Sequence, residues 1–231
     1  MRWTPALLIL LSACGSSPRH ETAPHDEHAH HDAHAHHADH AHHRFDDVAR
    51  WSKVFDDPAR AAWQMPEEVL RLCDLQPGMT VVDLGAGTGY FMAPLSAAVG
   101  DQGRVIPLDV EDALVQHMKQ RAFEGKLMNA EPRQIPHDDP QLAPGSVDRI
   151  LIVDTWHHLD DRVAYARKLA AGLKPGGKVI VVDFTPETTM GPPPAARTPL
   201  ESVMADLDAA GLHAELMPEG LPEQYVVVAT K

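Results

Sequence analysis

The hydrophobic positions of the chain acquire a regular pattern only after about residue 45. Four short runs rich in β-branched residues, 80–83, 104–109, 149–154 and 178–183, are almost continuously apolar. Strands with such runs are buried on both faces, which is typical of a parallel sheet covered by helices on each side. Amphipathic stretches lie between the runs. The stretch 112–123, for example, gathers four apolar side chains on one helical face. The pattern predicts an α/β fold with a doubly wound sheet.

The end of the chain departs from this parallel pattern. A predicted strand at 213–217 and a final one at 224–230 are separated by about half a dozen residues, whereas a parallel crossover needs a dozen or more. The final strand is therefore expected to be antiparallel. Before them, Thr198-Pro199-Leu200-Glu201 predicts a helix that opens with a capping box, has proline at its first position and stops at Gly211.

A glycine-rich turn follows the first predicted strand. Residues 83–89 read Asp-Leu-Gly-Ala-Gly-Thr-Gly, so glycines occupy alternate positions and an acid stands two residues before the first. Such glycines allow a tight turn and let a ligand lie directly against the backbone. Tyr90 stands where a dinucleotide-binding GxGxxG motif has its third glycine. Asp109 ends the second strand, where a carboxylate can accept hydrogen bonds from two ribose hydroxyls.

The turn resembles the first motif of the class I S-adenosylmethionine (SAM) methyltransferases, and residues 173–178 resemble that family's turn before its fifth strand. The resemblance covers residues 74–231 and implies a Rossmann-like, seven-stranded, mostly parallel sheet with an antiparallel last strand. It also implies that SAM is the cofactor, with its ribose at Asp109 and its adenine beside Val110. The cofactor contacts implied in this way are Asp83, Gly85, Ala86, Gly87, Gly89, Asp109, Val110, Asp139 and Asp154.

Two parts of the site stay open at this stage. The family's acid for the adenine amino group is expected at the position of Pro136, which cannot serve, so Asp138 and Asp139 are the candidates to replace it. A base is needed only if the methyl acceptor loses a proton. His157 and His158, after the fourth strand, are the candidate catalytic residues, although a His-His-Leu sequence here also resembles a structural feature of the family.

Residues 45–73 precede the first strand and contain several aromatic side chains. By resemblance, helices here cover the cofactor cleft. We expect a lid in which Arg60 or Gln64 reaches the methionine carboxylate of SAM. Simple packing of the aromatic side chains over the sheet edge is the alternative.

The beginning of the chain has a different composition. The net charge of the 231-residue chain is −13, which argues against nucleic acid as a partner. Eleven of the 16 histidines lie within residues 20–43. Residues 14–44 hold little apolar content besides alanine, so a disordered tether is expected. The candidate ligands for Zn(II), Ni(II) or Cu(II) are His28, His30, His31, His34, His36 and His37. A solvated linker without metal is the alternative.

The first 13 residues carry one positive charge and a short apolar run that ends in Leu11-Ser12-Ala13-Cys14. The run is too short to span a bilayer and predicts a secretory signal. Its end resembles a bacterial lipobox, which implies cleavage before Cys14 and a lipid anchor on that cysteine. The expected location is the periplasmic side of the outer membrane or the cell surface. The predicted organisation is a signal peptide at 1–13, the tether at 14–44 and a catalytic domain at 45–231.

Together these features predict a SAM-dependent methyltransferase, anchored to a membrane, that acts on a small or lipid-like acceptor. SAM is made inside the cell, so an exported enzyme would need a supply of cofactor. This conflict leaves an alternative: a cell-surface binding protein on a methyltransferase scaffold, with a tether that sequesters metal. The sequence makes no prediction of the oligomeric state.

Overall fold

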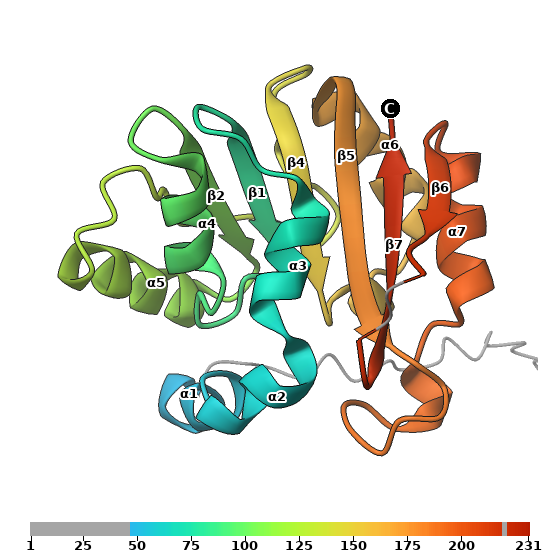
Figure 1. The fold of residues 1–231 in the computed structure, drawn as a ribbon, viewed down its shortest axis with the longest axis horizontal. Helices are drawn as coiled ribbons and strands as arrows, with labels where there is room; N and C mark the ends of the chain where they lie inside the picture. The colour runs from blue at the N-terminus through green and yellow to red at the C-terminus, as the bar shows by residue number, and fades with distance from the viewer. Residues whose placement is uncertain (1–46, 219–220) are drawn as a thin grey trace, which may run out of the picture. The chain divides into compact units, whose positions relative to one another are not determined.

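The computed structural model describes residues 47–218 and 221–231 (Figure 1). The predicted signal peptide, Cys14 and the histidine-rich tether lie outside the described residues. The first elements of the described residues are the helices α1 (Val48–Phe55), η1 (Pro58–Arg60), α2 (Ala61–Gln64) and α3 (Pro66–Cys73). None of the helices within the described ranges has the length and apolar character required to cross a membrane.

Seven strands form one sheet with the order β3-β2-β1-β4-β5-β7-β6. The strands are β1 (Thr80–Leu84), β2 (Arg104–Asp109), β3 (Arg133–Gln134), β4 (Val147–Val153), β5 (Leu173–Phe184), β6 (His213–Leu216) and β7 (Gln224–Thr230). Strands β1 to β5 pair in parallel, whereas β7 is antiparallel to both β5 and β6. The predicted doubly wound sheet with its antiparallel last strand is confirmed.

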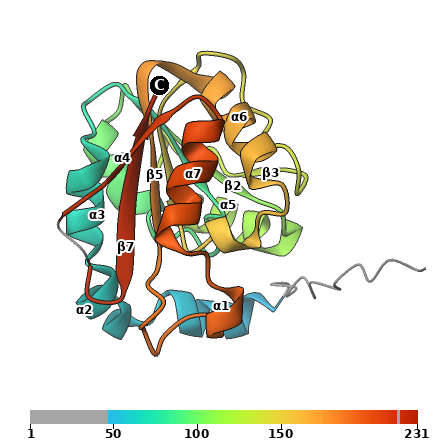
Figure 2. The same ribbon diagram turned by 90° about the vertical axis from the view of Figure 1, so that its right-hand side faces the viewer.

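Helices cover both faces of the sheet. They are α4 (Met92–Val99), α5 (Asp112–Glu124), α6 (Arg162–Gly172) and α7 (Leu200–Ala209), with short helices η2 (Trp156–His158) and η3 (Pro194–Ala196) in the connections. Figure 2 shows α3 and α4 on one side of the sheet and α6 and α7 on the other. Alternate residues of one strand enter the two layers: Val179 and Val181 pack toward α6 and α7, and Ile180 and Val182 toward α3 and α4. This two-sided burial explains why the strands are continuously apolar.

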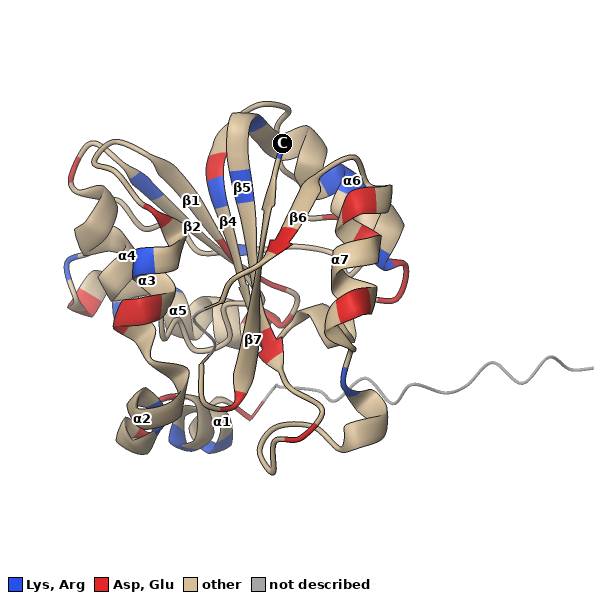
Figure 3. Ribbon diagram, turned by 45° about the vertical axis from the view of Figure 1, so that its right-hand side comes forward, with Lys and Arg blue, Asp and Glu red and all other residues tan. Residues whose placement is uncertain are grey.

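Charged residues are interspersed along the outer helices (Figure 3). Helix α5 buries the apolar positions Leu114, Val115, Met118 and Ala122, as its periodicity predicts. Cys73 is fully buried at the end of α3, and burial raises the pKa of its thiol to about 12. This cysteine therefore behaves as a small apolar side chain of the core.

Two local predictions are wrong. Residues 173–178, expected as a turn, belong to β5, because the pairing of β4 with β5 continues past a register shift between Val147 and Arg149. Helix α7 begins at Leu200 without a capping box. Thr198 is buried instead, and its carbonyl accepts a hydrogen bond from the Tyr225 hydroxyl at 2.8 Å. The contact with β7 holds the residue away from the capping position.

Candidate functional site

The candidate site lies at the carboxyl ends of β1 and β4. The chain continues from β1 to β2 on one side of the sheet and from β4 to β5 on the other, so the order of strands reverses between β1 and β4. In open α/β sheets, ligands bind at such a reversal, outside the carboxyl ends of the strands. Asp83 and the glycine-rich turn lie at the end of β1, and Asp154 directly follows β4.

The glycine-rich turn directs its amide groups inward. Gly85 and Gly87 have φ angles of 71° and 57°, in the left-handed region that favours glycine. The N–H groups of Gly85 and Ala86 both donate to the Leu108 carbonyl, and that of Gly87 donates to Asp109 Oδ2 at 2.9 Å. Three consecutive amides are therefore already engaged with β2. They do not form the open cradle of N–H groups with which a dinucleotide-binding turn holds a pyrophosphate.

The acids predicted for the cofactor lie at this end of the sheet. Asp83 is 3% exposed, and its Oδ2 has no hydrogen-bond partner among the described residues. Burial, reinforced by the nearby Asp109, raises the pKa of Asp83 to about 7 although Arg60 acts in the opposite direction. Burial also raises the pKa of Asp109. Burial raises the pKa of Asp154 to about 7, again against the influence of Arg60. The site thus concentrates carboxyl groups that would gain from a cationic ligand.

Asp109 is held from two directions by the main chain. Its Oδ2 accepts from Gly87, and its Oδ1 accepts from the N–H of Glu111 at 3.0 Å. Because a carboxylate offers about four lone-pair sites, each oxygen can still accept a bond from a ligand. The residue is therefore oriented before any ligand arrives. Val110 follows it, and the Val110 carbonyl accepts a hydrogen bond from the Gln134 side chain at 3.0 Å.

The acids predicted near the adenine lie in the connection between β3 and β4. Asp139 Oδ1 accepts from the main-chain N–H of Gln141 at 2.8 Å, and Asp138 is exposed. Gln134 ends β3 directly opposite Asp109 in the parallel register. Its contact with Val110 therefore brings a side-chain amide beside Asp109 and Val110.

The end of helix α1 covers the glycine-rich turn. A Cβ placed on Gly87 would lie 3.4 Å from the Phe55 ring, so that ring packs over the turn. Asp56 accepts hydrogen bonds from the Thr88 hydroxyl at 3.1 Å and from Arg121 of α5 at 2.8 Å. The segment is thereby fastened to both flanks of the turn.

A polar network links this covering segment to the strands. Arg60 donates to the Gln64 side chain at 2.8 Å and lies 3.6 Å from Asp154. Gln64 is fully buried and donates to Gln224 at 2.7 Å, and Gln224 in turn donates to Asp154. The Arg60 guanidinium also lies 4.4 Å from the centre of the Tyr90 ring. Gln224 begins β7, so residues 160 positions apart share one hydrogen bond. Nothing local in the sequence could reveal that pairing.

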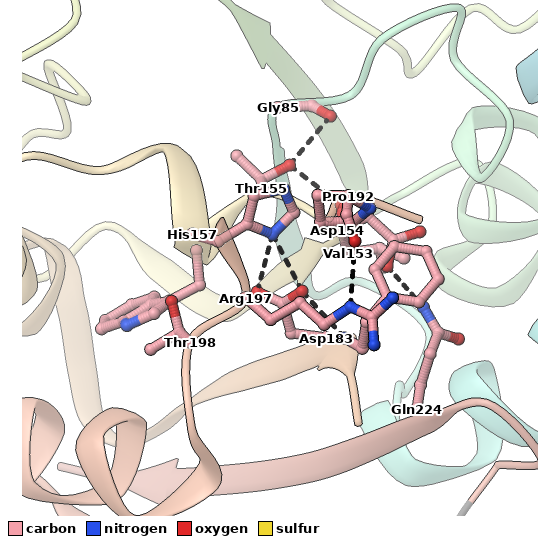
Figure 4. A network of polar contacts seen from close by, with 12 residues as sticks. Gly85, Val153, Asp154, Thr155, His157, Asp183, Pro192, Arg197, Thr198 and Gln224 are labelled. Carbon is pink, nitrogen blue, oxygen red and sulfur yellow. Dashed lines mark hydrogen bonds and ion pairs between the residues drawn. The ribbon is translucent and has the colours of Figure 1, made fainter. Parts of the chain in front are cut away.

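His157 contacts a buried acid on the neighbouring strand (Figure 4). Its Nδ1 lies 2.9 Å from Asp183 Oδ1 and 3.1 Å from Oδ2. The side chains of His157 and Asp183 are 5% and 1% exposed. His158 is exposed, and its ring centre lies 4.2 Å from that of His157. The structure thus distinguishes the two predicted histidines, and it adds Asp183. The sequence held one signal for Asp183, because it ends an apolar strand as Asp83, Asp109 and Asp154 do.

The segment after β5 crosses the same end of the sheet. The Arg197 guanidinium donates to the carbonyls of Pro186 at 2.8 Å and Met190 at 3.1 Å, and its Nε donates to Pro192 at 2.9 Å. A Cβ on Gly191 would meet the Phe184 ring at 2.5 Å. One arginine therefore holds the segment 186–192 in a folded shape against the end of β5.

No group of three or more His, Cys, Asp and Glu side chains within the described ranges is arranged to hold a metal ion. The six histidines predicted as ligands lie outside those ranges.

Comparison with known proteins agrees with this geometry. Residues 81–177, from β1 into β5, match the protein family described as "Methyltransferase domain". The crystal structure of a SAM-dependent methyltransferase from Aquifex aeolicus is 29% identical, covers 80% of this chain and 98% of its own, and has a TM-score of 0.74. The fold is that of the class I methyltransferases, and residues 81–177 resemble the methyltransferase domain family.

More specific likenesses extend over less of the chain. A demethylmenaquinone methyltransferase from Bacillus cereus is 27% identical over 135 residues. These residues are 56% of this chain and 54% of the relative, so the chain spans about half the length of the curated relatives it matches. The [4+2]-cyclase SpnF is 16% identical, with a TM-score of 0.62 over 74% of this chain and 81% of its own. SpnF shares the fold alone.

Proposed function

We propose that this protein is a SAM-dependent methyltransferase that acts on a small or lipid-like acceptor. The observation that carries the proposal is the unpartnered, buried Oδ2 of Asp83 beside a turn whose first amides face inward. A buried carboxylate oxygen without a partner is costly unless a ligand supplies a donor. The methionine ammonium of SAM is such a donor, and the sulfonium adds a second positive charge. The residues present therefore fit SAM better than they fit a pyrophosphate.

Each part of SAM then has residues to hold it. Asp109, oriented by two main-chain N–H groups, accepts the ribose hydroxyls. Val110 and Gln134 lie on the adenine side. Arg60 and Gln64, from the covering segment, are the groups available for the methionine carboxylate. Arg60 would then exchange part of its contact with Asp154 for the ligand.

Bound SAM supplies a methyl group on a positively charged sulfur. The protein's contribution is to align the acceptor with that methyl group and to exclude water. Helix α1 serves the second task, because Phe55 already covers Gly87. We propose residues 45–73 as the lid of the site. His157 is proposed as the base, since its Nδ1 is engaged with Asp183 and its Nε2 remains available.

The relatives support a lipid-like acceptor, because their name identifies demethylmenaquinone as what they methylate. The chain shares only about half of their length, and the acceptor contacts are therefore argued from this protein's own residues.

Calorimetric titration of residues 45–231 and of the full chain with SAM tests the proposal. Asp109→Ala is expected to weaken binding at least tenfold, and Asp160→Asn, an exposed acid on the connection after η2, is expected to leave it unchanged. No binding at millimolar SAM by the wild-type protein would refute the enzyme and favour a binding protein on this scaffold.

We also propose that Cys14 is lipidated and that the histidines of residues 20–43 bind Zn(II), Ni(II) or Cu(II). The sequence patterns of these segments support both proposals. Loss of acyl labelling in Cys14→Ala would support the anchor, and absence of labelling in the wild-type protein would refute it. Deletion of residues 20–43 is expected to abolish zinc uptake and to leave SAM affinity unchanged. Zinc uptake that survives the deletion would refute the metal site.

A further inference from the structure

Asp183 is a buried carboxylate that no step of cofactor binding uses. It ends the apolar run of β5, is 1% exposed, and lies against the ring of His157. A carboxylate in the core of a sheet is costly, and an apolar side chain would suit the strand better. Both of its oxygens are within hydrogen-bond distance of a single atom, His157 Nδ1.

We propose that Asp183 is a positioning residue that fixes the tautomer of His157, so that Nε2 accepts a proton from the methyl acceptor. This inference rests on the proposed methyl transfer. It adds a partner for the base and a chemical class for the acceptor.

The tautomer follows from the hydrogen bonds. An ionised Asp183 only accepts, so Nδ1 must carry the hydrogen of the contact and a neutral ring keeps the bare lone pair on Nε2. The N–H of Phe184 donates to Asp183 Oδ1 at 2.9 Å, which prevents rotation of the carboxylate. Nε2 has no hydrogen-bond partner among the described residues. The atom also keeps some accessible surface, because it is not among the fully buried polar atoms that lack a partner, although the His157 side chain as a whole is only 5% exposed.

The place of this pair relative to the glycine-rich turn is set by Thr155. Its hydroxyl donates to the Val153 carbonyl at 2.9 Å, and a Cβ on Gly85 would lie 2.3 Å from Thr155 Oγ1. Thr155 thus fills the space beside the first glycine, and His157 follows two residues later on η2 (Figure 4). The pair stands on the β5 side of the strand reversal, and the methyl donor is proposed on the β1 side. An acceptor between them would meet both.

A base is useful only for an acceptor that loses a proton. We therefore assign the acceptor to the phenols and enols, whose hydroxyl is un-ionised at neutral pH. In the transfer, the oxygen forms a bond to the methyl carbon and the carbon–sulfur bond breaks, with its electron pair left on sulfur. The hydroxyl proton passes to Nε2 of His157.

Nitrogen-15 NMR of the full chain, with labelled histidine, tests the tautomer without any turnover. His157→Gln identifies the His157 signals. At pH 8.5 the wild-type ring is expected to carry hydrogen on Nδ1 and none on Nε2. In Asp183→Asn, the Phe184 N–H still donates to Oδ1, so the side-chain NH2 group takes the place of Oδ2 and donates to His157 Nδ1. Nδ1 must then accept, and the ring hydrogen is expected to move to Nε2. Asp160→Asn is the matched control and should change neither ring nitrogen.

Two results would overturn the proposal: a wild-type ring with hydrogen on Nε2, or an unchanged tautomer in folded Asp183→Asn. Methyl transfer from SAM to hydroquinone is expected to fall about 10²- to 10⁴-fold in Asp183→Asn, with SAM affinity unchanged. Equal rates, or transfer to thiophenol or aniline but not to hydroquinone, would also overturn it. Failure of the wild-type protein to bind SAM would refute the methyltransferase proposal and the role of Nε2 in the transfer, whereas the tautomer set by Asp183 is decided independently by the NMR measurement.

Discussion

At the end of β2, an acid of the site is held by main-chain N–H groups, whereas the acids at the ends of β4 and β5 also contact side chains from distant segments. Asp109 is held by the N–H groups of Gly87 and Glu111. On the other side, Asp154 depends on Arg60 and Gln224, and His157 depends on Asp183. The first arrangement is encoded within about 30 residues of sequence and the second joins distant segments. A local motif can therefore identify the cofactor side of a site while the acceptor side remains hidden.

The largest effect is expected on the cofactor side, from Gly85→Ala. The alanine would have to keep the backbone φ of 71°, and its Cβ would lie 2.3 Å from Thr155 Oγ1. Backbone strain of this kind costs on the order of 1–3 kcal/mol. Displacement of Thr155 adds to that cost and disturbs the turn. We expect SAM affinity to fall more than tenfold and the free energy of unfolding to decrease, as measured by titration and by urea denaturation.

Gly145→Ala is the matched control for this substitution. Gly145 has a φ of 61°, but a Cβ there would meet nothing within 4 Å. It therefore carries the strain without the steric conflict. An equal loss of stability in both variants would show that Thr155 does not pack tightly against the turn.

A smaller effect, shared by both sides of the site, is a dependence of stability on pH. The pKa values of Asp83 and Asp154 are about 7 in the folded protein, against about 3.9 for an unfolded chain. Between these values the folded state binds more protons, so the free energy of unfolding falls as pH rises from about 4 to 7. The fall is expected to be on the order of a few kcal/mol.

Urea denaturation of the free protein at pH 5 and pH 8 measures this dependence. Asp83→Asn is expected to reduce it and Asp160→Asn to preserve it. SAM, as a cation, favours the ionised carboxylates, so its binding should tighten from pH 6 to pH 8 with release of protons. An identical pH slope in wild type and Asp83→Asn would contradict the assignment of a raised pKa to Asp83.

The smallest effect is expected from Gln64→Ala, which interrupts the network between the lid and β7. The substitution leaves the buried Gln224 amide without its partner, at a cost of about 1–3 kcal/mol. Gln116→Ala, on the exposed face of α5, is expected to change stability by no more than about 0.5 kcal/mol. Hydrogen exchange should also be faster in α1 and α2 of Gln64→Ala. Similar stability of the two variants would mean that the network does not fasten the lid.

Much of the fold was predictable because local patterns determine it. Strands at 104–109 and 224–230 were predicted at their observed bounds. Both are apolar runs whose residues are almost all buried in the sheet, so the ends of the run coincide with the ends of the strand. The antiparallel last strand followed from the length of one connection. The helix start at Thr198 was wrong because the Tyr225 hydroxyl, from a distant strand, holds the Thr198 carbonyl.

The sequence by itself determines the sheet, the glycine-rich turn and the acids at the ends of the strands, because each depends on neighbours along the chain and on the periodicity of burial. Only the tertiary structure decided which of those acids lacks a partner, which histidine meets a carboxylate, and that Gln64 meets Gln224. These are contacts between residues 26 to 160 positions apart. Their formation depends on how strands and helices pack together, and a pattern read along one segment holds no information about the distant segment that it meets.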